Sequence, residues 1–195
     1  YSMFWIKADV NGNKTWSKLY NNCSSDGYAI TQLTDGNFVA AGEISGEFIT
    51  DEEQLRLEAQ GDGLVVKFDG NGNLIWTRTV KEDSRDTPAK LIPTKEGGFV
   101  MTGMTGKLVG QADVADVMHI MFLGNFNTNG ETNWLKEIDA DVQHELKFAE
   151  QTKDGGYILI GNIKLVKEND QNVPALVKLK KDGTYEWATG LESVP

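Results

Sequence analysis

The stretch Val65–Val80, VVKFDGNGNLIWTRTV, decides the fold of this chain because its pattern occurs four times. An apolar run leads into Asp-x-Asn-Gly-Asn, and a second run that contains a tryptophan follows. Gly and Asn tolerate the positive φ that tight turns need, so the stretch predicts two antiparallel strands joined by a short turn. The other copies are residues 5–20 (WIKADVNGNKTWSKLY), 121–138 (MFLGNFNTNGETNWLKEI) and 176–191 (LVKLKKDGTYEWATGL).

A second kind of hairpin alternates with the first. It occurs in residues 29–44 (AITQLTDGNFVAAGEI), 89–104 (AKLIPTKEGGFVMTGM) and 147–162 (KFAEQTKDGGYILIGN). The tryptophans of the first hairpin recur every 53 to 60 residues, and a glycine of the second hairpin recurs with a similar spacing. We interpret seven residues as structural, with each tryptophan burying its ring between neighbouring sheets: Trp16, Trp76, Trp134, Trp187, Gly42, Gly103 and Gly161.

Two hairpins per repeat predict an all-β chain of four-stranded antiparallel sheets, arranged as the blades of a β-propeller. A sheet of this kind needs neighbours to cover its faces. We expect about three and a half blades in a single segment, residues 1–195, with a half-blade at 1–20 and blades at about 28–80, 88–138 and 145–191. Closed propellers have roughly four to eight blades, so we expect further blades of the same propeller, or a second chain, to complete the ring.

The repeats resemble the β-propeller repeats common in bacterial secreted and surface proteins, whose blades carry a K-[LF]-D-x-x-G-N-x-x-W hairpin and a DGG-[YF]-x-x-x-G hairpin. KADVNGNKTW and KFDGNGNLIW match the first motif, KLKKDGTYEW lacks its Asp, and the third copy has Phe122 where Lys is expected. The first hairpin also resembles a shortened form of the quinoprotein propeller motif. These resemblances imply a propeller and an extracellular or cell-surface location, but no activity, because the repeated residues are structural.

Composition narrows the range of partners. A formal net charge of −10 and the lack of a basic stripe argue against nucleic acid. No stretch approaches the roughly 18 consecutive apolar residues that membrane insertion requires. The segments between hairpins, residues 42–62, 81–87, 106–117, 139–145 and 163–172, contain 17 of the 29 acidic residues and 6 of the 19 basic ones. The propeller topology places these segments on one face, which we therefore expect to be acidic.

This acidic loop face is the predicted binding site for a protein or glycan ligand or a divalent ion. The alternative is a solvated surface that serves solubility alone. Ca²⁺ is the one cofactor considered, but in Asp9-x-Asn11-Gly12-Asn13 and its copy at residues 69–73 the Gly comes too early for an EF-hand loop, which favours a hairpin turn. The candidate binding residues are Glu43, Glu47, Asp51, Glu52, Glu53, Asp62, Glu82, Asp83 and Asp86.

No catalytic or metal-ligating group stands out in the sequence. Cys23 has no base near it in sequence, and the two histidines, His119 and His144, form no metal-ligand pattern. We therefore expect a non-catalytic binding, adhesion or scaffolding module. The alternatives are the propeller domain of a carbohydrate-active enzyme, a glycosidase or lyase, with a pair of convergent carboxylates, and a structural spacer.

Overall fold

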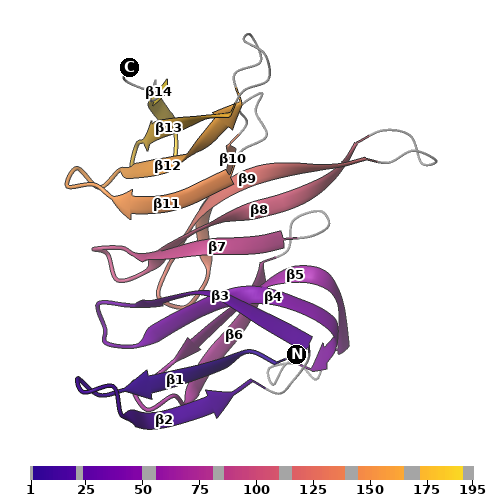
Figure 1. The fold of residues 1–195 in the computed structure, drawn as a ribbon, viewed down its shortest axis with the longest axis vertical. Helices are drawn as coiled ribbons and strands as arrows, with labels where there is room; N and C mark the ends of the chain where they lie inside the picture. The colour runs from indigo at the N-terminus through magenta and orange to yellow at the C-terminus, as the bar shows by residue number, and fades with distance from the viewer. Residues whose placement is uncertain are drawn as a thin grey trace.

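The computed structural model is all-β and describes residues 2–20, 24–49, 56–80, 86–109, 116–138, 145–164 and 172–190. Fourteen strands in these residues form one two-stranded and three four-stranded antiparallel sheets (Figure 1). The prediction of an all-β chain of four-stranded antiparallel sheets is confirmed. Among the residues described, no helix is present that is long and apolar enough to cross a membrane.

The sheets follow one another along the chain. The first sheet contains β1 (Phe4–Ala8) and β2 (Lys14–Leu19). The second contains β3 (Ser24–Gln32), β4 (Phe38–Ile49), β5 (Arg56–Phe68) and β6 (Leu74–Val80). The third contains β7 (Asp86–Pro93), β8 (Phe99–Val109), β9 (Asp116–Phe126) and β10 (Thr132–Ile138). The fourth contains β11 (Glu145–Gln151), β12 (Tyr157–Lys164), β13 (Asn172–Leu179) and β14 (Tyr185–Gly190).

Consecutive strands are hydrogen-bonded neighbours in every sheet, so each sheet is an up-and-down meander. The sheets stack in chain order, from the indigo first sheet to the yellow end of the fourth (Figure 1). Strand β7 contacts β3, β4 and β5 of the second sheet, and β11 contacts β7 and β8 of the third. The first strands of neighbouring sheets therefore lie side by side, as they do in propeller blades.

The short turns share one geometry, which explains why the same residues recur. In the turn after β5, Asp69 N–H donates to the Asn73 carbonyl and Gly72 N–H donates to the Asp69 carbonyl. The Asp69 carboxylate accepts the N–H groups of Asn71 and Asn73 at 2.8 and 2.9 Å. Gly72 has φ +79°, a left-handed conformation that glycine adopts without strain. These turns project to one side of the stack, while the long β4–β5 and β8–β9 hairpins extend to the other (Figure 1).

The core lies between the sheets in three apolar clusters, one at each interface. Central strands are buried on both faces: in β5, Leu64 and Val66 pack toward the first sheet while Val65 packs toward the third. Representative members are Trp5, Leu64 and Phe68 in the first cluster, Val65, Phe99 and Phe122 in the second, and Leu123, Tyr157 and Leu159 in the third. Each interface therefore supplies a dry core that a single sheet lacks.

The recurring glycines of the second hairpin lie opposite bulges in the first strand of each sheet. The register shifts between Gly27 and Ala29 where β3 passes Gly42. A Cβ atom at Gly42 would lie 1.7 Å from the Asp26 carbonyl oxygen, and one at Gly103 would lie 2.6 Å from that of Thr87. Close backbone approach at the bulge thus excludes a side chain at both positions. Gly161 pairs with Leu146 beside the corresponding bulge of β11.

Two sequence-based boundaries differ from the structure. Residues 42–49 and 56–62 belong to β4 and β5, so the prediction that 42–62 is a loop segment between hairpins is wrong for those residues. Likewise, β8 continues to Val109 and β9 begins at Asp116, within the expected segment 106–117. Strand β4 carries two glutamates, Glu43 and Glu47, within a run of apolar and small residues, and acidic side chains do not prevent a segment from pairing as a strand.

Candidate functional site

Two members of the predicted acidic site, Glu43 and Asp62, have side chains that the structure describes. Glu43 and Asp62, at the centres of β4 and β5, are only 8% and 6% exposed. The Tyr28 hydroxyl donates to the Glu43 carboxylate at 3.4 Å, and Asp62 also has an interaction partner. These two carboxylates are interior groups of the second sheet rather than parts of a loop surface.

The other members of the predicted acidic site are only partly described. Glu47 and Asp86 lie in strands β4 and β7. Five residues lie outside the described part of the chain: Asp51, Glu52, Glu53, Glu82 and Asp83. A ligand role for this group stays a prediction.

The carboxylates of the short turns accept hydrogen bonds from backbone N–H groups of the same turn. The Asn13 N–H donates to Asp9 and holds the pKa of that carboxyl below its usual range, and Asn73 does the same for Asp69. Within the described ranges, no three His, Cys, Asp or Glu side chains gather as a metal site would require. His119 lies in β9, while Cys23 and His144 fall outside those ranges.

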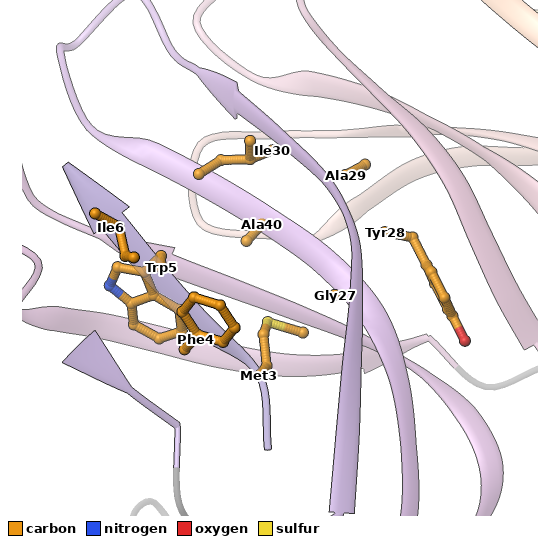
Figure 2. A pocket seen from close by; sticks show the side chains of 9 residues that line it. All are labelled: Met3, Phe4, Trp5, Ile6, Gly27, Tyr28, Ala29, Ile30 and Ala40. Carbon is orange, nitrogen blue, oxygen red and sulfur yellow. The ribbon is translucent and has the colours of Figure 1, made fainter. Parts of the chain in front are cut away.

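A pocket of about 320 Å³ lies beside β1, where the first sheet meets the second. Figure 2 shows Met3 and strand β1 on one side of this pocket and strands β3 and β4 on the other. The pocket is lined by Met3, Phe4, Trp5, Ile6, Gly27, Tyr28, Ala29, Ile30 and Ala40, none of which carries a charge. Phe4, Ile6 and Ile30 are more than half exposed, so apolar surface faces solvent here.

The edge of β1 beside this pocket has no strand paired to it among the described residues. The corresponding strands of the other sheets, β5, β9 and β13, pair on both sides. Tyr20 N–H donates to the Met3 carbonyl, so Met3 points its backbone toward the β2 side. By the alternation of an antiparallel ladder, the N–H and C=O groups of Phe4 and Ile6 point toward the open edge. Unpaired groups of this kind form a template for another strand.

Trp5 lines this pocket with a largely buried ring. The ring is 8% exposed and stacks on Phe68 with 4.7 Å between ring centroids. Its indole Nε1 is buried and has no hydrogen-bond partner in the described structure. A buried donor without an acceptor costs about 1–3 kcal/mol of stability.

The sequence did not single out these pocket residues, although it contained a signal for them. Four copies of the tryptophan hairpin alternate with three copies of the other hairpin, and the unmatched copy is the first sheet. That unmatched hairpin is β1–β2, whose inner edge is the open edge of the pocket.

Neither a protein-family model nor a curated protein matches the chain. The geometry described above is therefore the basis for assigning a function.

Proposed function

We propose that this chain is a non-catalytic binding and scaffolding module that takes up an extended apolar β-hairpin of a partner protein at the open edge of β1. The observation that carries the proposal is that, among the described strands, β1 has a partner on one side only, while β5, β9 and β13 have partners on both. Strand addition obtains affinity from main-chain hydrogen bonds and selectivity from pockets for the side chains. A secreted or surface location rests on the resemblance of the repeats and stays a prediction.

The second sheet shows what pairing at this edge requires. Strand β5, the counterpart of β1, pairs Leu64 with Gly42 and Val66 with Ala40 of β4. The aligned repeats place Phe4 and Ile6 of β1 at the positions of Leu64 and Val66. A partner strand would therefore pair with Phe4 and Ile6 while its second strand covered the exposed Ile30.

A protein partner suits this site better than a glycan. The lining is uncharged and apolar, and among the described residues the hydrogen-bonding groups left open beside it are those of a strand edge. A peptide main chain offers alternating donors and acceptors at the spacing of such an edge, which a sugar ring does not.

The test uses the chain's own hairpin as the probe. A blocked synthetic peptide with the sequence of residues 29–44, AITQLTDGNFVAAGEI, carries the strand type that pairs with β5. Isothermal titration should show saturable binding to the wild-type chain. Ile6→Pro removes an N–H that points to the open edge and should weaken binding about tenfold or more, the loss of roughly one hydrogen bond with added steric conflict.

Ser17→Pro is the matched control, because Ser17 pairs with Ile6 and points its backbone to the outer edge of the same sheet. It should leave peptide binding unchanged, and circular dichroism should show that both variants keep their β structure. Absence of peptide binding to the wild-type chain, or equal losses in the two proline variants, would refute strand addition at β1.

A further inference from the structure

Neighbouring sheets are joined by a repeated polar contact. Trp16 Nε1 and Lys7 Nζ, both in the first sheet, donate to the Gly70 carbonyl at 3.2 and 3.0 Å. One sheet further on, Trp76 Nε1 and Lys67 Nζ donate to the Thr128 carbonyl at 3.3 and 3.1 Å. In both cases the acceptor is the residue after the first Asp or Asn of the turn in the next sheet's tryptophan hairpin. We call this residue the turn acceptor.

The tryptophan ring of each such contact also covers the turn glycine. A Cβ atom at Gly72 would lie 2.9 Å from the Trp16 ring, and one at Gly130 would lie 2.8 Å from the Trp76 ring. At the third interface, a Cβ at Gly183 would lie 2.6 Å from the Trp134 ring. The absence of a side chain at this glycine therefore makes room for the tryptophan of the preceding sheet.

The fourth sheet presents the tryptophan of this contact without an acceptor. The Trp187 side chain is 42% exposed, and its indole Nε1 donates no hydrogen bond within the described ranges, while its backbone pairs with β13. Lys178, at the position of Lys67, is buried and pairs with Asp154 at 3.1 Å and Glu186 at 3.4 Å. Burial opposes its charge, but the two carboxylates outweigh burial and raise the pKa of Lys178. Lys178 Nζ also donates to the Leu179 carbonyl at 3.1 Å, so its three protons already have acceptors within the fourth sheet, and the available donor at this end is the Trp187 indole.

The first sheet presents the acceptor half without donors. Val10 is the turn acceptor of this sheet, and its carbonyl accepts no hydrogen bond in the part of the chain that is described. Gly12 has φ +82°, and a Cβ atom placed there would meet nothing within 4 Å. Of the four tryptophan-hairpin turns in the structure, only this one has an uncovered glycine.

The flat faces at the two ends match as well. The face of the first sheet that points away from the second exposes Phe4 and Leu19, whereas Leu64, the counterpart of Phe4, is fully buried at a sheet interface. In the fourth sheet Leu159 packs toward the third sheet, so its neighbour Ile160, which is 36% exposed, points to the free face. The two ends are therefore the two halves of the apolar interface that the chain already makes between its sheets.

We propose that two copies of this chain associate end to end, with Trp187 of each copy binding the Asp9–Asn13 turn of the other. The indole N–H would donate to the Val10 carbonyl, and the ring would cover Gly12. A head-to-tail contact either closes or grows into a fibre. Two copies bring six four-stranded and two two-stranded sheets, about seven blades, and because rings of roughly four to eight blades close, the expected product is a closed dimer. This contact uses the faces and turns of the sheets, and the strand-addition site uses the edge of β1.

Sedimentation equilibrium over a range of protein concentrations tests the proposal. The wild-type mass should rise from 21.5 kDa toward twice that value. Gly12→Ala places a Cβ where the Trp187 ring would lie, and Trp187→Ala removes the ring. Each should raise the dissociation constant about tenfold or more, the effect of losing roughly 1.4 kcal/mol at an interface.

Matched controls separate association from folding. Gly36→Ala is the control for Gly12→Ala, because Gly36 has φ +84° and open space around its Cβ position, so the two changes cause the same backbone strain. Ile75→Ala is the control for Trp187→Ala, because it removes a comparably exposed aliphatic side chain from an outer strand. Both controls should dimerise as the wild type does. A mass of 21.5 kDa at every concentration, growth beyond a dimer, or unchanged dimerisation of Gly12→Ala and Trp187→Ala would overturn the proposal.

Discussion

At the scale of single residues, Lys67 shows why a charged side chain recurs in an apolar strand. Its ammonium is nearly inaccessible and binds the Asp35 carboxylate at 2.8 Å together with the Thr128 hydroxyl at 2.8 Å and carbonyl at 3.1 Å. Three acceptors satisfy the three protons of an ammonium, which makes its burial tolerable. The contacts link strand β5 and one turn of the second sheet to a turn of the third, so the lysine of the repeat is a structural residue.

The Asp35 end of this contact predicts a pH dependence. Burial raises the pKa of Asp35, but hydrogen bonds from Lys67 and Asn37 outweigh it and hold the pKa below the ordinary value of 3.8. Because the folded-state pKa is depressed, the stabilisation is present above pH 3.8 and disappears as the pH falls through the folded-state value. Asp35→Asn should lower the free energy of unfolding in urea by about 1–2 kcal/mol at pH 7, with solvent screening at this partly exposed carboxylate limiting the loss.

Urea titrations of the wild type and Asp35→Asn from pH 7 to pH 2 measure this difference. The two curves should converge in acid, since protonated Asp35 and asparagine are both uncharged. A gap that stays constant over the whole range would show that the ionised carboxylate has no part in the stabilisation.

At the scale of elements, the glycine of a tryptophan-hairpin turn has two roles that can be separated. Gly130 needs a positive φ and lies under the Trp76 ring, whereas Gly36 needs a positive φ alone. Gly36→Ala should cost about 1–2 kcal/mol of unfolding free energy through backbone strain. Gly130→Ala should cost about 1–3 kcal/mol more, because its Cβ overpacks the interface between the second and third sheets. Equal urea midpoints for the two variants would contradict the packing role.

The hairpins were predictable from the sequence because their determinants are local. Asp69 to Asn73 specify a turn through their own side chains and φ preferences, without help from distant residues. The strand segments 42–49 and 56–62 could not be predicted from their acidic residues. A charged side chain indicates that a residue is exposed to solvent, but it does not indicate the conformation of the backbone. Glu43 and Asp62 show the consequence, since pairing of β4 with β5 buries both.

At the scale of the whole molecule, the position of a sheet in the stack determines whether its repeated residues are buried or exposed. Trp16, Trp76 and Trp134 pack against the cluster of the next interface, while Trp187, in the same motif, is 42% exposed because no described sheet follows it. The expectation of a buried ring thus fails for Trp187. The open edge of β1 has the same origin. Neither feature could be read from one repeat, because each depends on which neighbours are present.

Because the sheets stack in one dimension, a destabilising substitution should affect mainly its own sheet and the adjacent ones. Each cluster joins only adjacent sheets, so stability should be the sum of sheet and neighbour terms rather than a property of one common core. Leu64 and Leu159 are both fully buried, the former at the first interface and the latter at the third. Each Leu→Ala change should cost about 2–5 kcal/mol locally through the cavity it leaves.

Hydrogen exchange at backbone amides distinguishes local from global loss. Leu159→Ala should speed exchange in β11–β14 and in the facing strands of the third sheet while leaving β1–β6 at wild-type rates, and Leu64→Ala should produce the reverse distribution. The pair serves as its own control, since the two changes delete the same atoms from equally buried sites. Uniform acceleration across all four sheets in both variants would mean that the sheets unfold as one cooperative unit, and the interfaces could then no longer be treated as separate sources of stability.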